Sequence, residues 1–222
     1  MKYYELRYNH NHDSKGRFSS GSGSGGTSAK QYTISAHVTV ESNFIANRSI
    51  IDSKEYADKF NGIVLLPPVK QKIVETARES IYENDGTQNE TISFLDKWTG
   101  AQVGEKYHFE YQGGLSAGGT VTIPNAPDNS LILVHNHGNS SPFSFNDFYM
   151  LNECPQVKTI IAAGHNGTVY KMSVGNGKRL DMSGDKKYNY ERVFNHLYDH
   201  KTGDLKALNI FCNDLGWGVE YE

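Results

Sequence analysis

The sequence predicts an α/β (α+β) protein in which a single mixed central β-sheet is flanked by helices. Apolar residues at positions 31–40 alternate along the chain, which is the two-residue period of a strand. Between residues 67 and 82 they recur instead at helical spacing, and Pro67-Pro68 suits the first turn of a helix. Segments of these two kinds follow one another in mixed order, which favours one sheet with helices between and after its strands.

The regions of the 222-residue chain follow from where these patterns begin and end. Residues 13–30 are rich in Gly and Ser and nearly free of large apolar side chains, so we expect a flexible linker. The expected regions are a flexible Gly/Ser-rich leader (1–30), an N-terminal extension with a strand and a helix (31–66), a core (67–180) and a helical C-terminal tail (181–222).

Turn and capping residues separate the expected elements of the chain. The helix at 67–82 stops at the Asp85-Gly86 turn, and a further helix begins at Ser144 and ends by Cys154-Pro155. The remaining expected elements are a short helix at 52–60, a hairpin of strands 90–96 and 101–112, strands at 118–124, 130–137, 157–164 and 168–175, and polar helices at about 185–200 and 203–214.

Composition argues against several classes of protein. The net charge of −3 and the pI of about 6.3 provide no overall positive field for nucleic acid. The N-terminus lacks the apolar core of a secretory signal, and no apolar run reaches the roughly 20 residues of a membrane helix. Cys154 and Cys212 are far apart, so we expect buried reduced thiols. We therefore expect a cytoplasmic protein with no nucleic-acid or membrane partner.

Two histidines at the end of an apolar run are the first candidate site residues. Residues 131–134 (LILV) are typical of a strand, and His135 and His137 follow directly. Side chains two residues apart on a strand point to the same face, about 6.6 Å apart, so two imidazoles can converge on one metal ion while Asn136 faces away. A second H-x-H at residues 10–12 has no strand around it, and we expect it to be an uninvolved polar segment.

Asp147 can supply a third ligand. The Gly, Asn, Ser and Pro residues at 138–142 can reverse the chain, and a helix that begins at Ser144 aims its first turn back at the histidines. Ser144 and Asp147 also form an acceptable helix-capping pair. The two roles are compatible, because a carboxylate at a helix N-terminus can also bind a cation. Capping alone, however, leaves the paired histidines unexplained.

Three protein ligands leave one coordination position for water, which is the open geometry of a catalytic zinc site. A structural zinc ion prefers a closed set of four ligands. Zinc lowers the pKa of the bound water toward neutrality, and a carboxylate must then accept the proton of that water. A hydrogen-bond donor should stabilise the oxyanion that develops on the substrate, and Ser144 is placed to be that donor. The carboxylate must come from elsewhere in the chain.

The stretch HNHGNSSPFSFND (135–147) resembles the H-x-H-P-x(5–6)-S-x-x-D signature of the JAMM (MPN-plus, JAB, RadC-like) zinc metallopeptidases. The resemblance implies a JAMM/MPN (cytidine-deaminase-like) architecture for the core, residues 67–180. It also implies that His135, His137 and Asp147 bind Zn²⁺ and that Ser144 stabilises the tetrahedral intermediate.

The general base of this family is a glutamate at the start of a strand upstream of the histidines. Glu90, which opens the strand at 90–96, matches that place, and Glu105 and Glu110 on the next strand are the alternatives. The chain departs from the family at Gly138, where proline is usual, so we expect a less rigid turn after the second histidine.

Sequence around the motif resembles JAB-type proteins of phages and prophages, over roughly residues 52–175. The segment HDSKGRFSSGSG (12–23) is similar to linkers of phage portal and minor head proteins. The resemblance implies a hydrolase of a peptide or isopeptide bond whose partner is a protein or peptide. A phage head protein and a ubiquitin-like conjugate are both candidate substrates. The expected location is the cytoplasm of a bacterial host or the virion.

Alternative interpretations remain open at this point. A catalytically silent JAMM-like scaffold of a phage particle would have the same fold. An HNH nuclease requires residues tens of positions apart rather than a literal tripeptide, and a cytidine deaminase requires a C-x-x-C pair that the chain lacks. His165 in the sequence GHNG is either a plain turn residue or a partner of the metal ligands.

Overall fold

The computed structural model describes residues 31–35, 44–63, 66–111, 118–175, 179–197, 212 and 217–221. Three expected segments therefore lie outside the described residues: the leader (1–30), the end of the first strand (36–40) and nearly all of the helix expected at 203–214.

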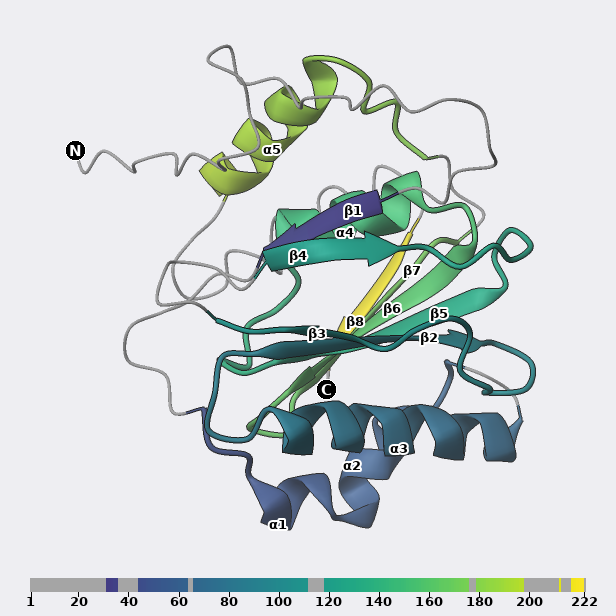
Figure 1. Cartoon of the computed structure of the whole chain (residues 1–222), viewed down its shortest axis with the longest axis vertical. Helices are drawn as coiled ribbons and strands as arrows, with labels where there is room; N and C mark the ends of the chain where they lie inside the picture. Colours follow the sequence, from purple (N-terminus) through teal and green to yellow (C-terminus); the bar gives the residue numbers. More distant parts are fainter. Residues whose placement is uncertain are drawn as a thin grey trace, which may run out of the picture.

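A six-stranded mixed sheet forms the centre of the described chain, in the order β3-β2-β5-β6-β7-β8 (Figure 1). Within it, β5 and β6 run parallel, and the other neighbouring pairs are antiparallel. The predicted mixed sheet is confirmed. Its strands are β2 (Glu90–Asp96), β3 (Tyr107–Phe109), β5 (Leu131–His137), β6 (Val157–Gly164), β7 (Val169–Ser173) and β8 (Gly218–Tyr221).

Helices cover both faces of this sheet, as predicted (Figure 1). On one face α3 (Pro67–Glu83) lies across β2, β5 and β6, with α1 (Arg48–Ile51) and α2 (Lys54–Asp58) beside it. On the other face lie α4 (Phe145–Glu153) and α5 (Lys186–Leu197).

β5 contributes to the cores on both faces because its side chains alternate. Ile132 and Val134 pack in the cluster beneath α3, and Leu131 and Leu133 pack in the cluster around α4. Parallel neighbours cannot be joined by a tight turn, so the chain crosses from β5 to β6 through α4. The crossover places the first turn of α4 close to the C-terminal end of β5.

The prediction of a single sheet is wrong. β4 (Gly118–Thr122) does not join the central sheet but pairs with β1 (Gln31–Ser35) in a separate two-stranded antiparallel sheet beside α4 (Figure 1). Side-chain contacts hold β4 in this second layer. Val121 is buried in the core around α4, and the hydroxyl of Tyr107 bonds both the N–H and the C=O of Thr122.

The tail expected to be helical also contains a strand, which was not predicted. α5 is present, but residues 218–221 form β8, which pairs antiparallel with β7 along Tyr170–Ser173. Gly218 opens this short strand and gives it a weak local signal, so its pairing with β7 determines its conformation. The short helix α1, which begins after Asn47, was not predicted either.

Both cysteines are buried free thiols, as predicted. Among the described helices, none combines the length and the apolar composition needed to cross a bilayer.

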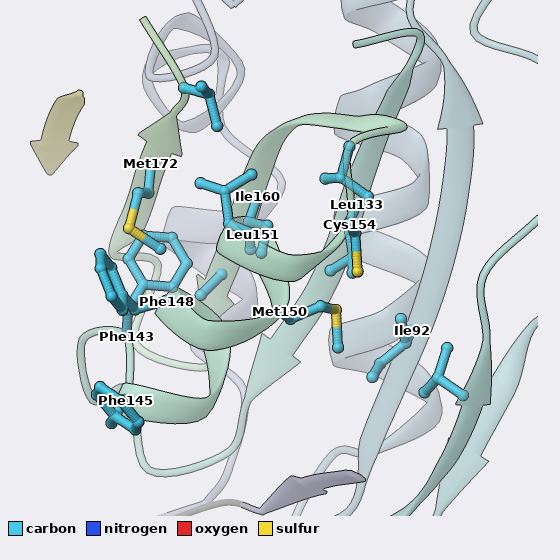
Figure 2. Close-up of a cluster of buried hydrophobic side chains, with 14 of the residues drawn as sticks. Ile92, Leu133, Phe143, Phe145, Phe148, Met150, Leu151, Cys154, Ile160 and Met172 are labelled. Atoms are coloured by element: carbon cyan, nitrogen blue, oxygen red, sulfur yellow. The ribbon is translucent and has the colours of Figure 1, made fainter. Parts of the chain in front are cut away.

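α4 is fixed to the sheet by the apolar side of its surface (Figure 2). Phe148 and Leu151 are fully buried, and the ring of Phe148 lies 5.2 Å from that of Trp217. Figure 2 shows these side chains directed toward Ile160 and Met172 on β6 and β7. This packing sets the rotation of α4 and therefore the direction in which its first turn projects.

Candidate metal centre

His135 and His137 lie at the C-terminal end of β5. Their side chains project toward the face of the sheet that carries α4. Leu131 and Leu133 precede them on the same face, so the alternation of the strand determines where both imidazoles point. Both side chains are buried, and their Nε2 atoms lie 2.9 Å apart. The convergence expected from the H-x-H spacing is present.

Asp147 meets the two histidines from the first turn of α4. One carboxylate oxygen, Oδ1, lies 3.3 Å from Nε2 of His135, and the other, Oδ2, lies 3.9 Å from Nε2 of His137. Ser144 is the N-cap, and its pair with Asp147 is a complete capping box. The cap and the cluster therefore coexist, because the same turn of helix serves both.

The capping box also determines which oxygen of Asp147 is available. Oδ2 accepts hydrogen bonds from the backbone N–H of Ser144 at 2.7 Å and from its hydroxyl at 2.8 Å. Oδ1 is the oxygen that faces His135. The arrangement favours one-oxygen coordination of a cation by Asp147.

His135, His137 and Asp147 can hold a metal ion, since one ligand atom from each lies within 4.8 Å of the others. Ligand atoms on a tetrahedral ion with bonds of ~2.1 Å lie about 3.4 Å apart. With Oδ1 as the ligand atom of Asp147, two of the three separations are close to that value: 2.9 Å between the Nε2 atoms of the histidines, and 3.3 Å between Oδ1 and Nε2 of His135. Two polar atoms at the site, Nδ1 of His135 and Oε2 of Glu90, are buried without a hydrogen-bond partner.

The protonation states of the cluster suit a cation. Burial and the neighbouring His135 lower the pKa of His137 to about 4, so its imidazole is neutral at pH 7. Its Nδ1 lies 2.7 Å from the backbone oxygen of Ser141, which can only accept, so Nδ1 carries the proton and Nε2 offers a lone pair. Burial opposes ionisation of Asp147, but His135, His137 and Ser144 together hold its pKa below the usual range.

Glu90 lies at the start of β2, on the same face of the sheet as this cluster. Its side chain is 2% exposed, and burial together with the charge of Asp147 raises its pKa well above the usual range. Glu105 and Glu110, the alternatives, are both exposed. Of these three glutamates, Glu90 is therefore the buried one, and it interacts electrostatically with Asp147.

The hydroxyl of Ser144 is engaged with Asp147, to which it donates. A serine hydroxyl has a single proton, so Ser144 must give up this bond before it can donate to a substrate oxygen.

A polar network on the opposite face of β5 was not foreseen from the sequence. Asn136 faces away from the histidines, as expected, and its amide bonds to the backbone of β2 and to Nε2 of His165. His165 is fully buried, and its Nδ1 lies 2.6 Å from the backbone oxygen of Phe44. His165 follows β6 in a turn but also contacts the residue between the two histidines. Asn84 completes this network, and no local pattern brings these residues together.

Gly138 is required by a close approach of two backbone segments. A Cβ at this position would lie 2.5 Å from the backbone oxygen of Thr87 and 3.2 Å from Cα of Gln88. These residues lead directly into Glu90. The expected looseness of a glycine turn is therefore offset by a tight contact between the end of β5 and the segment before β2.

Comparisons with protein-family models, with curated proteins and with solved structures give no match to this chain. The site is therefore interpreted from its own geometry and chemistry.

We expect Gly138→Ala to lower the free energy of unfolding by about 1–3 kcal/mol, because the added methyl group overlaps the backbone at Thr87. Gly218→Ala is the matched control, since a Cβ there meets nothing within 4 Å. Urea denaturation of both variants measures the difference. Equal stability of the two would show that the approach at residue 138 is not tight.

We expect Glu90→Gln to stabilise the metal-free protein increasingly as the pH rises above about 4.5, the usual pKa of a glutamate. Because its pKa is raised on folding, Glu90 binds its proton more tightly in the folded than in the unfolded chain, so the contribution of Glu90 to stability falls as the pH rises. Each pKa unit corresponds to ~1.4 kcal/mol. Glutamine has no such penalty, and the contribution of His137 cancels because both proteins contain it.

Urea denaturation in the presence of a chelator, repeated at several pH values, measures this effect. Glu110→Gln is the control, because Glu110 is exposed. A stability difference that stays constant with pH would contradict the raised pKa of Glu90.

Proposed function

We propose that this protein is a zinc-dependent hydrolase of a peptide or isopeptide bond. The observation that supports this most is a buried group of His135, His137 and Asp147 with a second carboxyl group, Glu90, buried on the same face and coupled to Asp147. Two imidazoles and one carboxylate are a usual donor set for a catalytic zinc ion. Neither free cysteine belongs to this group, so the site has no thiolate ligands.

Zinc, when bound, acts as a Lewis acid that polarises a carbonyl group and makes water a nucleophile near neutral pH. Glu90 would accept the proton of the attacking water and pass it to the leaving amine. Its buried, partner-free oxygen Oε2 is available for this transfer, and a raised pKa brings a carboxyl group closer to the operating pH.

Ser144 would donate its hydroxyl proton to the oxyanion that develops on the substrate carbonyl. For this it exchanges its bond to Asp147 for one to the substrate. The backbone N–H of Ser144 still holds Oδ2 of Asp147, so the ligand stays oriented during the exchange.

The JAMM-type motif at residues 135–147 supports an amide bond as the scissile group, and the phage-like flanking segments support a phage structural protein as substrate. A ubiquitin-like conjugate is the other candidate. The proposed location is the cytoplasm of a bacterial host or the virion.

A non-catalytic scaffold is the second candidate function. It is favoured by the closure of the site, because the side chains of Glu90, His135, His137, Ser144 and Asp147 are each no more than 8% exposed. A scaffold could retain the metal ion without turning over any substrate.

We expect the purified full chain to contain about one zinc ion per molecule, and His135→Ala and Asp147→Ala to lose it. Elemental analysis after removal of loosely bound metal measures the content. His108→Ala is the control, because His108 is exposed and lies outside the cluster. If all four proteins had the same zinc content, the ion would bind elsewhere.

We expect the zinc-loaded chain to cleave members of a peptide library that contains linear bonds and lysine-linked isopeptide bonds, detected by mass spectrometry as new termini. Glu90→Gln should retain zinc and lose roughly 10²–10⁴-fold in rate. Ser144→Ala should lose about 10²–10³-fold.

Glu110→Gln, an exposed-glutamate control, should cleave as wild type does. Zinc binding without cleavage of any library member, in wild type as in Glu90→Gln, would favour the scaffold.

A further inference from the structure

The pairing of β2 with β5 ends at the first metal-ligand candidate. Its last pair is Ile92 with His135. Continuing it would pair Glu90 with His137 and bring the base candidate directly against a metal-ligand candidate. The two strands separate at this point instead.

The side-chain amide of Asn136 fills the place where the ladder would continue. Its Oδ1 accepts from the backbone N–H of Thr91 at 2.8 Å, and its Nδ2 donates to the backbone oxygen of Asn89 at 3.0 Å. A peptide group of a neighbouring strand would make the same two bonds to β2. The backbone of β5 therefore stands one side chain away from β2 at the level of Glu90.

The remaining hydrogen-bonding positions of this amide are also filled. Oδ1 accepts a second bond from Nδ2 of Asn84 at 3.0 Å, and Nδ2 lies 3.1 Å from Nε2 of His165. The carbonyl of Phe44 takes the proton of His165 Nδ1, so Nε2 can only accept in the neutral ring. The orientation of the amide is thus determined by its surroundings.

β5 and β2 are each held on their outer side. β5 remains paired with β6 through His137 and Gly164, beyond the point where it leaves β2. β2 remains paired with β3 through Glu90 and Phe109. The amide of Asn136 is therefore the connection that sets the distance between two independently anchored strands.

We propose that Asn136 is a positioning residue for Glu90: its amide replaces a peptide group between β5 and β2 and so opens the space between the Glu90 carboxyl group and the metal ligands. This role rests on the proposed function, because it matters for turnover only if Glu90 acts on water at the site. Asn136 itself makes no bond to His135, His137 or Asp147 among its hydrogen bonds.

The test compares Asn136→Leu, which keeps the size of the side chain and removes its hydrogen bonds, with Asn152→Leu. Asn152 is an equally buried asparagine whose amide bonds the backbone of Leu180, at the far end of α4. Both variants lose the bonds of a buried amide, so a general loss of stability affects both. Differences between them report on the position of Asn136.

Amide hydrogen exchange on the metal-free full chain tests whether the Asn136 amide bonds the backbone beside Glu90, independently of zinc binding and catalysis. We expect the N–H of Thr91 to exchange much faster in Asn136→Leu than in Asn152→Leu, because it loses its acceptor. Equal protection of Thr91 in the two variants would overturn the proposal, whatever the protein catalyses.

Measurements on the zinc-loaded chain then test how the loss of this amide affects metal binding and turnover. We expect Asn136→Leu to bind zinc with an affinity loss well below the roughly 10- to 100-fold typical when a partner of a metal ligand is removed. We expect its turnover to fall about 10²-fold, as for a misplaced catalytic group. The double variant Asn136→Leu/Glu90→Gln should be no slower than Glu90→Gln alone. The visible spectrum of the cobalt(II)-substituted protein should change as it does in Glu90→Gln.

Two outcomes overturn the proposal at this stage. Loss of zinc as large as in His135→Ala would make Asn136 a support of the ligands rather than of Glu90. A cobalt spectrum and turnover equal to those of Asn152→Leu would leave it no role at the site. Failure of the proposed function has a different signature, since wild type would then bind no zinc or Glu90→Gln would turn over normally.

Discussion

Four ionisable side chains are buried together between β2, β5 and α4, and the surrounding structure is arranged around this constraint. An isolated buried charge is strongly unfavourable, and proteins respond by pairing it or by shifting its pKa. Here His135, together with the N–H and hydroxyl of Ser144, holds the pKa of Asp147 low, His137 is neutral, and burial and the charge of Asp147 raise the pKa of Glu90. A divalent cation would stabilise the carboxylates, so we expect the fold to be more stable with a metal ion bound than without it.

The sheet topology brings these groups together from distant parts of the chain. The parallel pair β5–β6 requires the α4 crossover, and the crossover returns Asp147 to the end of β5 only after a reversal through residues 138–143. The segment before β2 then approaches that reversal closely enough to require glycine at position 138. Beyond Ile92 and His135, β2 and β5 are no longer paired, and the amide of Asn136 bonds the backbone N–H of Thr91 instead.

Local patterns predicted the parts of the fold and of the site that depend on short-range periodicity. The alternation before His135 and the S-x-x-D cap were sufficient to predict which side chains face one another. The second sheet was missed because the pairing of β4 with β1 joins segments far apart in the chain, and β8 was missed because its strand conformation depends on its pairing with β7. The network around Asn136 was missed for the same reason, since a single asparagine between two histidines carries no sign of what it contacts.

X-ray absorption at the zinc edge of the purified full chain tests the central claim most directly, because it identifies the ligands of the bound ion. The structure predicts nitrogen and oxygen ligands at ~2.0–2.1 Å, with the outer-shell scattering of two imidazole rings and no sulfur. A sulfur ligand at about 2.3 Å, or an ion bound without imidazole, would contradict the assignment of the site to His135, His137 and Asp147.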